Sequence, residues 1–189
     1  IRVHNPDGSP NFYYEGNWRD IFQNWEALLY AYPGFLPHVV AKFVNASTVD
    51  GFNPYRLTRE GVDWEVPDPE DPWSYIGYWG DHQIVYLTRL LEALEAHWPG
   101  TLDEWLTEAA FSYADVPYRL AGHEETVADP RDTVGFDWTR AEAIEARVAE
   151  MGADGRLVPD PDAPGRVYHA TLAEKLIVPV LAKLGQLVL

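Results

Sequence analysis

Apolar residues recur with the period of an α-helix in several segments of the chain. The clearest case is 18–32, where one stripe is formed by Trp18, Ile21, Phe22, Trp25, Leu28, Leu29 and Tyr32. Similar spacing or a wide apolar face predicts further helices over about 35–45, 81–97, 101–113, 138–151 and 171–187. The last of these opens with the capping-box sequence Thr171-Leu-Ala-Glu174. The pattern therefore predicts an all-α protein with little sheet.

Two short turns repeat the same aromatic-Pro-Gly sequence. They are Tyr32-Pro33-Gly34 and Trp98-Pro99-Gly100, and each joins two predicted helices. Turns this short make consecutive helices antiparallel neighbours, so we expect αα-hairpins. The connections between hairpins, 46–78 and 115–136, are long and carry the polar motifs considered below. Tight turns should lie at one end of the array and functional loops at the other, as in a short helical solenoid or part of a closed ring.

Length and composition limit the other possibilities. A chain of 189 residues with 47% hydrophobic residues is long enough for one domain, and we treat 1–189 as a single helical-hairpin region. The sequence contains no run of about 18 apolar residues and opens with no signal segment, so we expect no membrane span and a cytoplasmic location. The absence of cysteine excludes disulfides and thiolate metal sites.

The net charge of −16 argues against nucleic acid and anionic membranes as partners. Such a field repels phosphate groups but leaves neutral ligands, sugars among them, unaffected. Aromatic residues make up 14% of the chain, and many lie in the long loops. They serve either as apolar plugs beneath those loops or as surfaces on which a ligand stacks.

The first candidate binding residues lie where helix 18–32 begins. They are Arg19, Asp20, Gln23 and Asn24, at the loop end of the first hairpin. A guanidinium and a carboxylate side by side suit vicinal hydroxyl groups, because each can bond two oxygen atoms at once. The alternative is a structural Arg–Asp pair in which the carboxylate stabilises the helix N-terminus.

The second candidates, Trp79, Asp81 and His82, precede the helix predicted from 81. They end an aromatic-rich run, Trp73-Ser-Tyr-Ile-Gly-Tyr-Trp79. Sugar rings bind where apolar faces and polar groups combine in this way. The alternative makes Asp81 a helix cap, His82 a packing residue and the aromatics a loop plug.

No residue is assigned a catalytic role. Acid–base glycoside chemistry requires carboxylates, and the candidates by position alone are Asp50, Asp63, Glu65 and Asp81. The cluster Asp68, Glu70 and Asp71 suits a hard cation such as Ca²⁺, but is more often an exposed charge run. The sequence His123-Glu-Glu125 lacks the second histidine of a zinc helix. We therefore expect no metal and no cofactor.

Three ordered motifs resemble those of a known enzyme family. Residues 16–24 are similar to the Gly-Tyr-Arg-Asp-x-x-Gln-Asp stretch of the cellobiose and chitobiose phosphorylases, and 79–87 and 111–118 resemble the motifs that follow it. The same motifs occur in an uncharacterised bacterial group of large proteins. The phosphorylases are inverting enzymes with an (α/α)6 toroid, so the resemblance implies part of such a toroid.

The resemblance also implies roles for individual residues. Arg19 would bind sugar hydroxyls in the subsite of the non-reducing residue, with Asp20 and Gln23 in support, while Asn24 stands where the family has an aspartate. The family's general acid lies in a Trp-Asn-Asp motif that this chain lacks. By this resemblance the chain is an incomplete part of a toroid, and the general acid lies beyond Leu189.

These observations predict a carbohydrate-active protein, part of an inverting glycoside hydrolase or phosphorylase, that binds an oligosaccharide or glycoside. The alternative is a non-enzymatic helical scaffold that binds a glycan or a protein through its aromatic loops. In either case the helix at 171–187 is apolar around its whole circumference. We expect it to be covered by the remainder of a longer chain or by another subunit.

Overall fold

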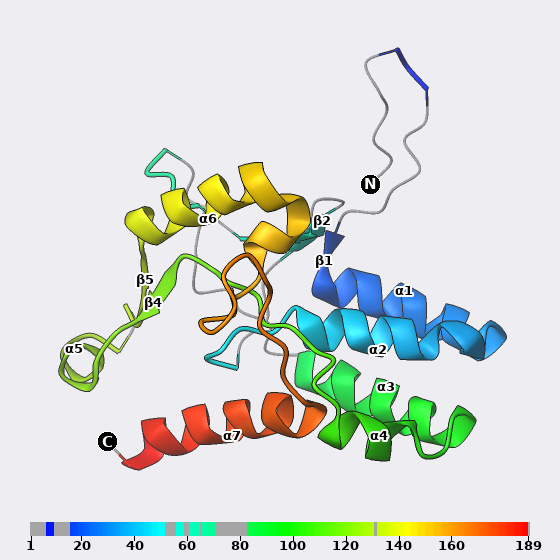
Figure 1. Cartoon of the computed structure of the whole chain (residues 1–189). Helices are drawn as coiled ribbons and strands as arrows, with labels where there is room; N and C mark the ends of the chain where they lie inside the picture. Colours follow the sequence, from blue (N-terminus) through cyan, green and yellow to red (C-terminus); the bar gives the residue numbers. More distant parts are fainter. Residues whose placement is uncertain are drawn as a thin grey trace.

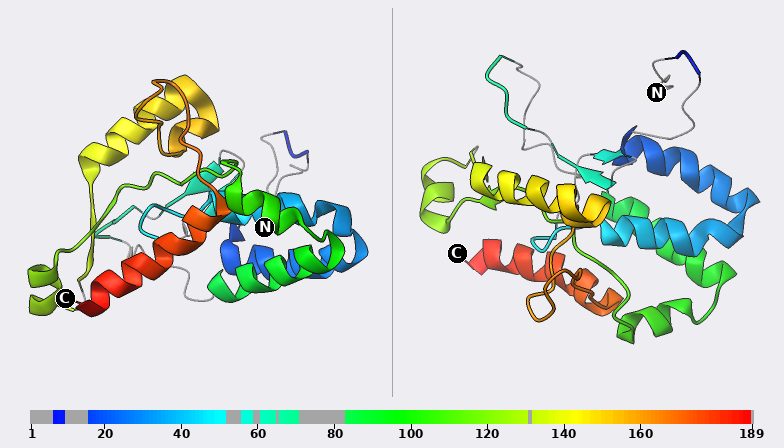
Figure 2. Two further views of the ribbon diagram at one scale, coloured as in Figure 1. Left: turned by 60° about the horizontal axis from the view of Figure 1, so that its bottom comes forward. Right: turned by 45° about the horizontal axis from the view of Figure 1, so that its top comes forward.

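The computed structural model describes residues 7–9, 16–51, 56–58, 61–64, 66–70, 83–130 and 132–188. In this part of the chain, helices α1 to α4 gather on one side of the molecule (Figure 1). Helix α6 and the pair of strands β4 and β5, with α5, lie on the other side. Helix α7 runs along one edge and projects away from the four-helix side, as all three views show (Figures 1 and 2).

All six predicted helices are present. The α-helices are α1 (Trp18–Ala31), α2 (Leu36–Asn45), α3 (Gln83–His97), α4 (Thr101–Thr107), α5 (His123–Ala128), α6 (Trp138–Met151) and α7 (Leu172–Val188). Two short 3-10 helices, η1 (Pro33–Phe35) and η2 (Gly152–Arg156), precede α2 and follow α6. Helix α6 has the predicted bounds, whereas α4 ends at Thr107 instead of about 113. Helix α5 was not predicted, and it begins where the Glu125 carboxylate accepts a hydrogen bond from Gly122 N–H at 2.9 Å.

The predicted all-α class, and with it a toroid built only from helical hairpins, is wrong. Strands β1 (Gly16–Asn17), β2 (Arg56–Thr58) and β3 (Gly61–Asp63) form an antiparallel sheet in that order, with Gly16 opposite Leu57 and Leu57 opposite Val62. Strands β4 (Tyr118–Leu120) and β5 (Val134–Phe136) form a second antiparallel pair. Each strand has two or three residues, too few for an alternating pattern to stand out in the sequence.

The two aromatic-Pro-Gly turns each join two helices, as predicted, but the first turn does not make its helices antiparallel. The axis of the chain turns by 120° between residues 24–31 and 33–45. The second turn places Gly100 at φ 90°, a backbone conformation that glycine adopts without strain. The indole N–H of Trp98 donates to the carbonyl oxygen of Pro33 at 3.1 Å, so the two aromatic-Pro-Gly turns lie side by side.

Helices α1 and α3 run in the same direction. The Arg89 guanidinium on α3 donates from Nε to the Glu26 carboxylate on α1 at 2.7 Å. Further along both helices, Trp98 bonds Pro33. Because the two contacts follow the same order along both segments, the helices are parallel. Their N-terminal ends therefore lie at the same end of the molecule, opposite the tight turns.

The segment 111–118 runs through the centre of the fold, and every one of its residues is buried. Its backbone forms hydrogen bonds with several distant parts of the chain. Phe111 and Ala170 exchange both backbone hydrogen bonds, Ala114 N–H donates to Ser47 O, and Asp115 N–H donates to Arg156 O. This pairing ends α4 early, because the residues after Glu108 make their hydrogen bonds outside the helix.

Helix α6 folds back on itself through η2 at very close range. A Cβ atom built on Gly155 would lie 2.4 Å from the backbone nitrogen of Val148 and 2.7 Å from the carbonyl oxygen of Arg147. Only glycine fits at that distance. The neighbouring Arg156 reaches across to β3, where its guanidinium donates to Val62 O at 2.9 Å and lies 5.0 Å from the ring centre of Trp64.

Across the described ranges, no single helix is both long and apolar enough to cross a membrane. The segments 24–31 and 33–45 reach that length and composition only when taken together, and they are bent against each other.

The contact at Gly155 provides a test of the fold. We expect Gly155→Ala to lower the free energy of unfolding by about 2–3 kcal/mol, because the added methyl group overlaps backbone atoms that cannot move aside. Gly34→Ala is the control, since its Cβ would meet nothing within 4 Å and its φ is not positive. Urea unfolding followed by circular dichroism measures both. Equal stability of the two variants would contradict this packing.

Candidate functional site

The helix directions bring the starts of α1 and α3 to the same end of the molecule. Helix α1 begins at Trp18, so Arg19 and Asp20 lie in its first turn. Helix α3 begins at Gln83, directly after the motif that contains Trp79, Asp81 and His82. Because α1 and α3 are parallel, both helices begin at the end opposite the tight turns, which we call the loop end. The short strand β1 leads directly into α1 there.

The side chains of this predicted site are described only in small part. Those of Arg19, Asp20 and Gln23 lie outside the described side chains, and Trp79, Asp81 and His82 lie outside the described residues. Asn24 is exposed on α1. The structure thus places the backbone of the first motif at the loop end, and the gathering of the side chains stays a prediction.

Two of the acidic residues named from the sequence, Asp63 and Asp68, have structural partners. The Asp63 carboxylate accepts a hydrogen bond from Arg156 at 3.3 Å, which ties β3 to η2. The Asp68 carboxylate accepts one from the backbone N–H of Glu70 at 2.9 Å, as in a turn. Asp50 is half-buried after α2. Glu65, Asp71 and Asp81 lie outside the described residues.

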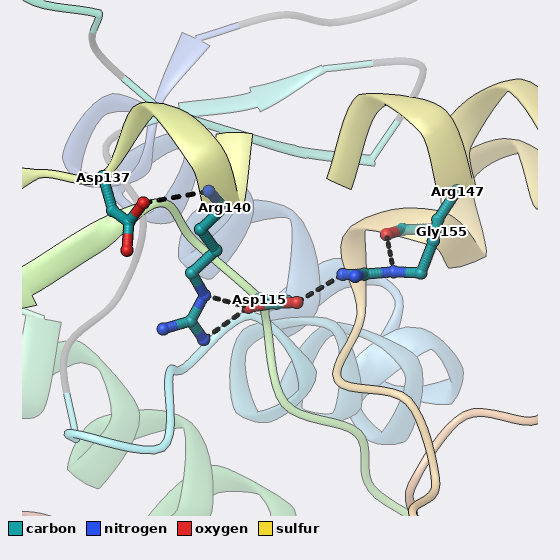
Figure 3. A network of polar contacts seen from close by, with 5 residues as sticks. All are labelled: Asp115, Asp137, Arg140, Arg147 and Gly155. Carbon is teal, nitrogen blue, oxygen red and sulfur yellow. Dashed lines mark hydrogen bonds and ion pairs between the residues drawn. The ribbon is translucent and has the colours of Figure 1, made fainter. Parts of the chain in front are cut away.

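Two arginines, Arg140 and Arg147, lie on either side of the buried carboxylate of Asp115 (Figure 3). One carboxylate oxygen accepts from Arg140 Nε at 2.8 Å and from the Nη2 of the same residue, and the other accepts from Arg147. The start of α6 is fixed by Asp137, whose carboxylate accepts from Arg140 N–H at 2.9 Å. The arginines remain partly exposed while Asp115 is 7% exposed. This network attaches α6 to the central segment and leaves its carboxylate no free face for a ligand.

A second buried ionisable group, Lys175, lies in the first turn of α7. Its amine donates to Ser112 O at 2.7 Å and to Ser47 O at 3.2 Å, and lies 3.5 Å from the ring centre of Tyr113. The residue is 5% exposed. Burial lowers the pKa of Lys175 from 10.5 to about 6, against the opposing effect of the charge on Glu174. An amine with these surroundings is chemically distinct from a surface lysine.

The neighbouring Glu174 is held by two tyrosines. Its carboxylate accepts hydrogen bonds from the Tyr113 hydroxyl at 3.0 Å and from the Tyr168 hydroxyl at 3.2 Å. The two rings stack with centres 6.3 Å apart. Burial, followed by the hydrogen bond to Glu174, raises the pKa of Tyr113 well above its usual 10, so its hydroxyl keeps its proton. Thr171 Oγ1 accepts from Glu174 N–H at 3.2 Å, as half of the predicted capping box, while the carboxylate serves the tyrosines instead.

Sequence reasoning missed the Lys175 cluster. The available signal was a lysine inside an otherwise apolar helix, directly after a capping box. Its partners come from Ser47 and Ser112, far away in the sequence, so no local pattern connects them.

An open apolar groove lies between α1 and α2 near their turn. It encloses about 370 Å³ and is lined by Trp25, Leu28, Leu29, Tyr32, Phe35 and Val39. Leu28, Tyr32 and Phe35 are each more than half exposed. A sugar requires polar groups beside its aromatic contacts, and these six side chains offer almost none. The groove therefore suits an apolar ligand or an apolar protein segment.

Neither a metal site among the described residues nor a matching protein points to a function. Among the described residues there is no group of three or more histidine, cysteine, aspartate or glutamate side chains that could hold a metal ion. No family model matches the chain, and no curated protein matches it. The function must therefore be inferred from the geometry and from the motifs.

The Asp115 network gives a prediction. We expect Asp115→Asn to lower the free energy of unfolding by about 2–4 kcal/mol, because Arg140 and Arg147 lose the buried carboxylate that neutralises their charge. Water at the partly exposed arginines keeps the loss from being larger. Glu26→Gln breaks the more exposed pair with Arg89 and should cost less than about 1 kcal/mol. Chemical unfolding of both variants measures the difference. A loss for Asp115→Asn as small as that for Glu26→Gln would show that the network is not needed.

Proposed function

We propose that this chain binds an oligosaccharide or glycoside at the loop end and contributes sugar-binding residues to a carbohydrate-active enzyme, an inverting glycoside hydrolase or phosphorylase. We place that enzyme in the cytoplasm. The observation that supports the proposal is the parallel arrangement of α1 and α3. It brings the start of α1, with Arg19 and Asp20, to the same end as the start of α3, which follows Trp79, Asp81 and His82.

The residue types at the two helix starts suit sugar chemistry. A guanidinium and a carboxylate can each bond two neighbouring hydroxyl groups, and the Gln23 and Asn24 amides add donors and acceptors. Trp79 would cover the apolar CH face of a ring. The net charge of −16 is compatible with a neutral ligand. It disfavours a phosphorylated ligand unless the binding site supplies a basic group. The likeness of the motifs to those of the cellobiose and chitobiose phosphorylases points to the same substrate class.

Titration of the full chain with neutral β-linked disaccharides, followed by calorimetry, tests the proposal. We expect cellobiose or chitobiose to bind, and Arg19→Ala and Asp81→Asn each to weaken binding roughly tenfold to a hundredfold through loss of a charged hydrogen bond. Arg119→Ala is the matched control, because this arginine is exposed on β4 and pairs with Glu125. Absence of binding by any tested saccharide, or equal affinity of Arg19→Ala and the wild-type chain, would refute it.

A second candidate function is protein binding by a helical scaffold. Two exposed apolar surfaces favour it: the groove between α1 and α2, and a stripe on α7. The stripe consists of Ile177, Val180, Leu181 and Leu184, each at least half exposed and spaced along one side of the helix. We propose that another polypeptide segment covers the α7 stripe, as part of a longer chain or as another subunit. This second proposal is compatible with the first, since the stripe and the loop-end motifs are separate.

The double variant Val180→Asp and Leu184→Asp tests the stripe. We expect the wild-type chain to self-associate or to bind an apolar dye, and the double variant to do so less, with its stability changed by no more than about 1 kcal/mol because both sites are exposed. Val127→Asp is the control, as Val127 is equally exposed but belongs to the short helix α5. Sedimentation equilibrium and dye fluorescence measure these effects. A wild-type chain that is monomeric and binds no dye would contradict the prediction.

A further inference from the structure

We propose that Lys175 is a pH-sensitive latch, which as a neutral amine joins the segments that follow α2 and α4 and on protonation in mild acid loosens their junction. The proposal is independent of the sugar-binding function. It concerns a buried group for which that function has no use.

Among the described residues the buried amine has no carboxylate partner, an arrangement that costs less for a neutral amine than for an ammonium ion. A neutral amine has two N–H groups, and two carbonyl oxygens accept them, those of Ser112 and Ser47. Protonation adds a third N–H and a full charge. Among the described residues the amine has no ion pair, and its remaining neighbour is the ring face of Tyr113. A ring face attracts a cation but replaces only part of its hydration.

The charged groups near Lys175 cannot remove this cost. The titratable or charged residues on the elements that pack around it are Glu174 on α7, Tyr113 and Asp115 on the central segment, Tyr168 and His169 before α7, Asp50 after α2, and Asp103, Glu104 and Glu108 on or after α4. Of these, Glu174 alone acts on the pKa of Lys175. Its carboxylate is already engaged by the two tyrosine hydroxyls. A charged Lys175 therefore competes with those hydroxyls or moves toward water, and either movement draws it from the carbonyl oxygens.

The junction that Lys175 makes holds two segments distant in sequence. Ser47 O accepts from both Lys175 and Ala114 N–H, and Ser112 N–H donates to the side chain of Asn45 at 2.9 Å. Residues 45–47 thus meet residues 112–114 through bonds that surround the amine. Loss of the amine from this position exposes those amides to solvent.

The effect on stability has a definite sign. In the unfolded chain the amine regains the ordinary pKa of 10.5, whereas in the fold it titrates near 6. Between these values the unfolded state binds one more proton, so stability rises as the pH rises through this window. Carboxylates titrate below this range, which separates their contribution from that of Lys175.

Carbon-13 NMR of the full chain labelled on lysine is the direct test, since the sequence contains three lysines, Lys42, Lys175 and Lys183. We expect one Cε resonance to titrate near pH 6 and to be absent in Lys175→Met. Amide hydrogen exchange at Ser112 and Ala114, corrected for the intrinsic pH dependence, should lose protection at least about tenfold between pH 7 and pH 5. The amides of α6 should keep their protection over the same pH range.

Stability measurements with a matched control complete the test. The urea midpoint of the wild-type chain and of Lys42→Met, an exposed lysine on α2, should rise between pH 7 and pH 9. That of Lys175→Met should stay level. If Lys175→Met does not fold, the wild-type titration and exchange data decide alone. A Lys175 resonance that titrates together with the other two lysines, or protection of Ser112 and Ala114 that is unchanged at pH 5, would overturn the proposal.

Discussion

The fold depends on the burial of one extended segment, residues 111–118. A buried peptide group without a hydrogen-bond partner lowers stability by about as much as a lost hydrogen bond. The backbone N–H and C=O groups of this segment must therefore be paired with other parts of the chain. The partners come from distant parts of the described chain. Ala170 pairs with Phe111, the carbonyl oxygen of Ser47 accepts from Ala114 N–H, and that of Arg156 accepts from Asp115 N–H. Polar contacts to this one strand-like segment therefore join residues 45–47, α6 with η2, and the residues before α7, in addition to apolar packing.

The sequence predicted what is periodic and missed what is not. Helices α1, α2, α3, α6 and α7 were found because apolar residues at helical spacing, or a wide apolar face, identify a helix without knowledge of its neighbours. Helix α4 was predicted too long because apolar residues continue past Thr107 at helical spacing, although they are buried as an extended segment. The strands escaped prediction because β1 pairs with β2 across about forty intervening residues, and neither is long enough to show alternation.

The backbone position of the first motif was predictable from the sequence, whereas the buried polar clusters were not. Motif order and turn length placed Arg19 and Asp20 at the loop end, and the parallel course of α1 and α3 agrees with that placement for the backbone. The Lys175 cluster was not predictable, because the burial of a lysine is decided by tertiary contacts. The same holds for Asp115, which resembles any polar loop residue until Arg140 and Arg147 of α6 are folded onto it.

Two buried polar contacts, at Asp115 and at Ser112, hold the central segment in place, and they differ in their response to pH. At Asp115 the segment is held by guanidinium groups, which keep their charge at any pH that a folded protein meets. At Ser112 it is held by an amine whose pKa burial has brought down to about 6. Mild acid should therefore release the segment from α7 and from the end of α2 while α6 stays attached.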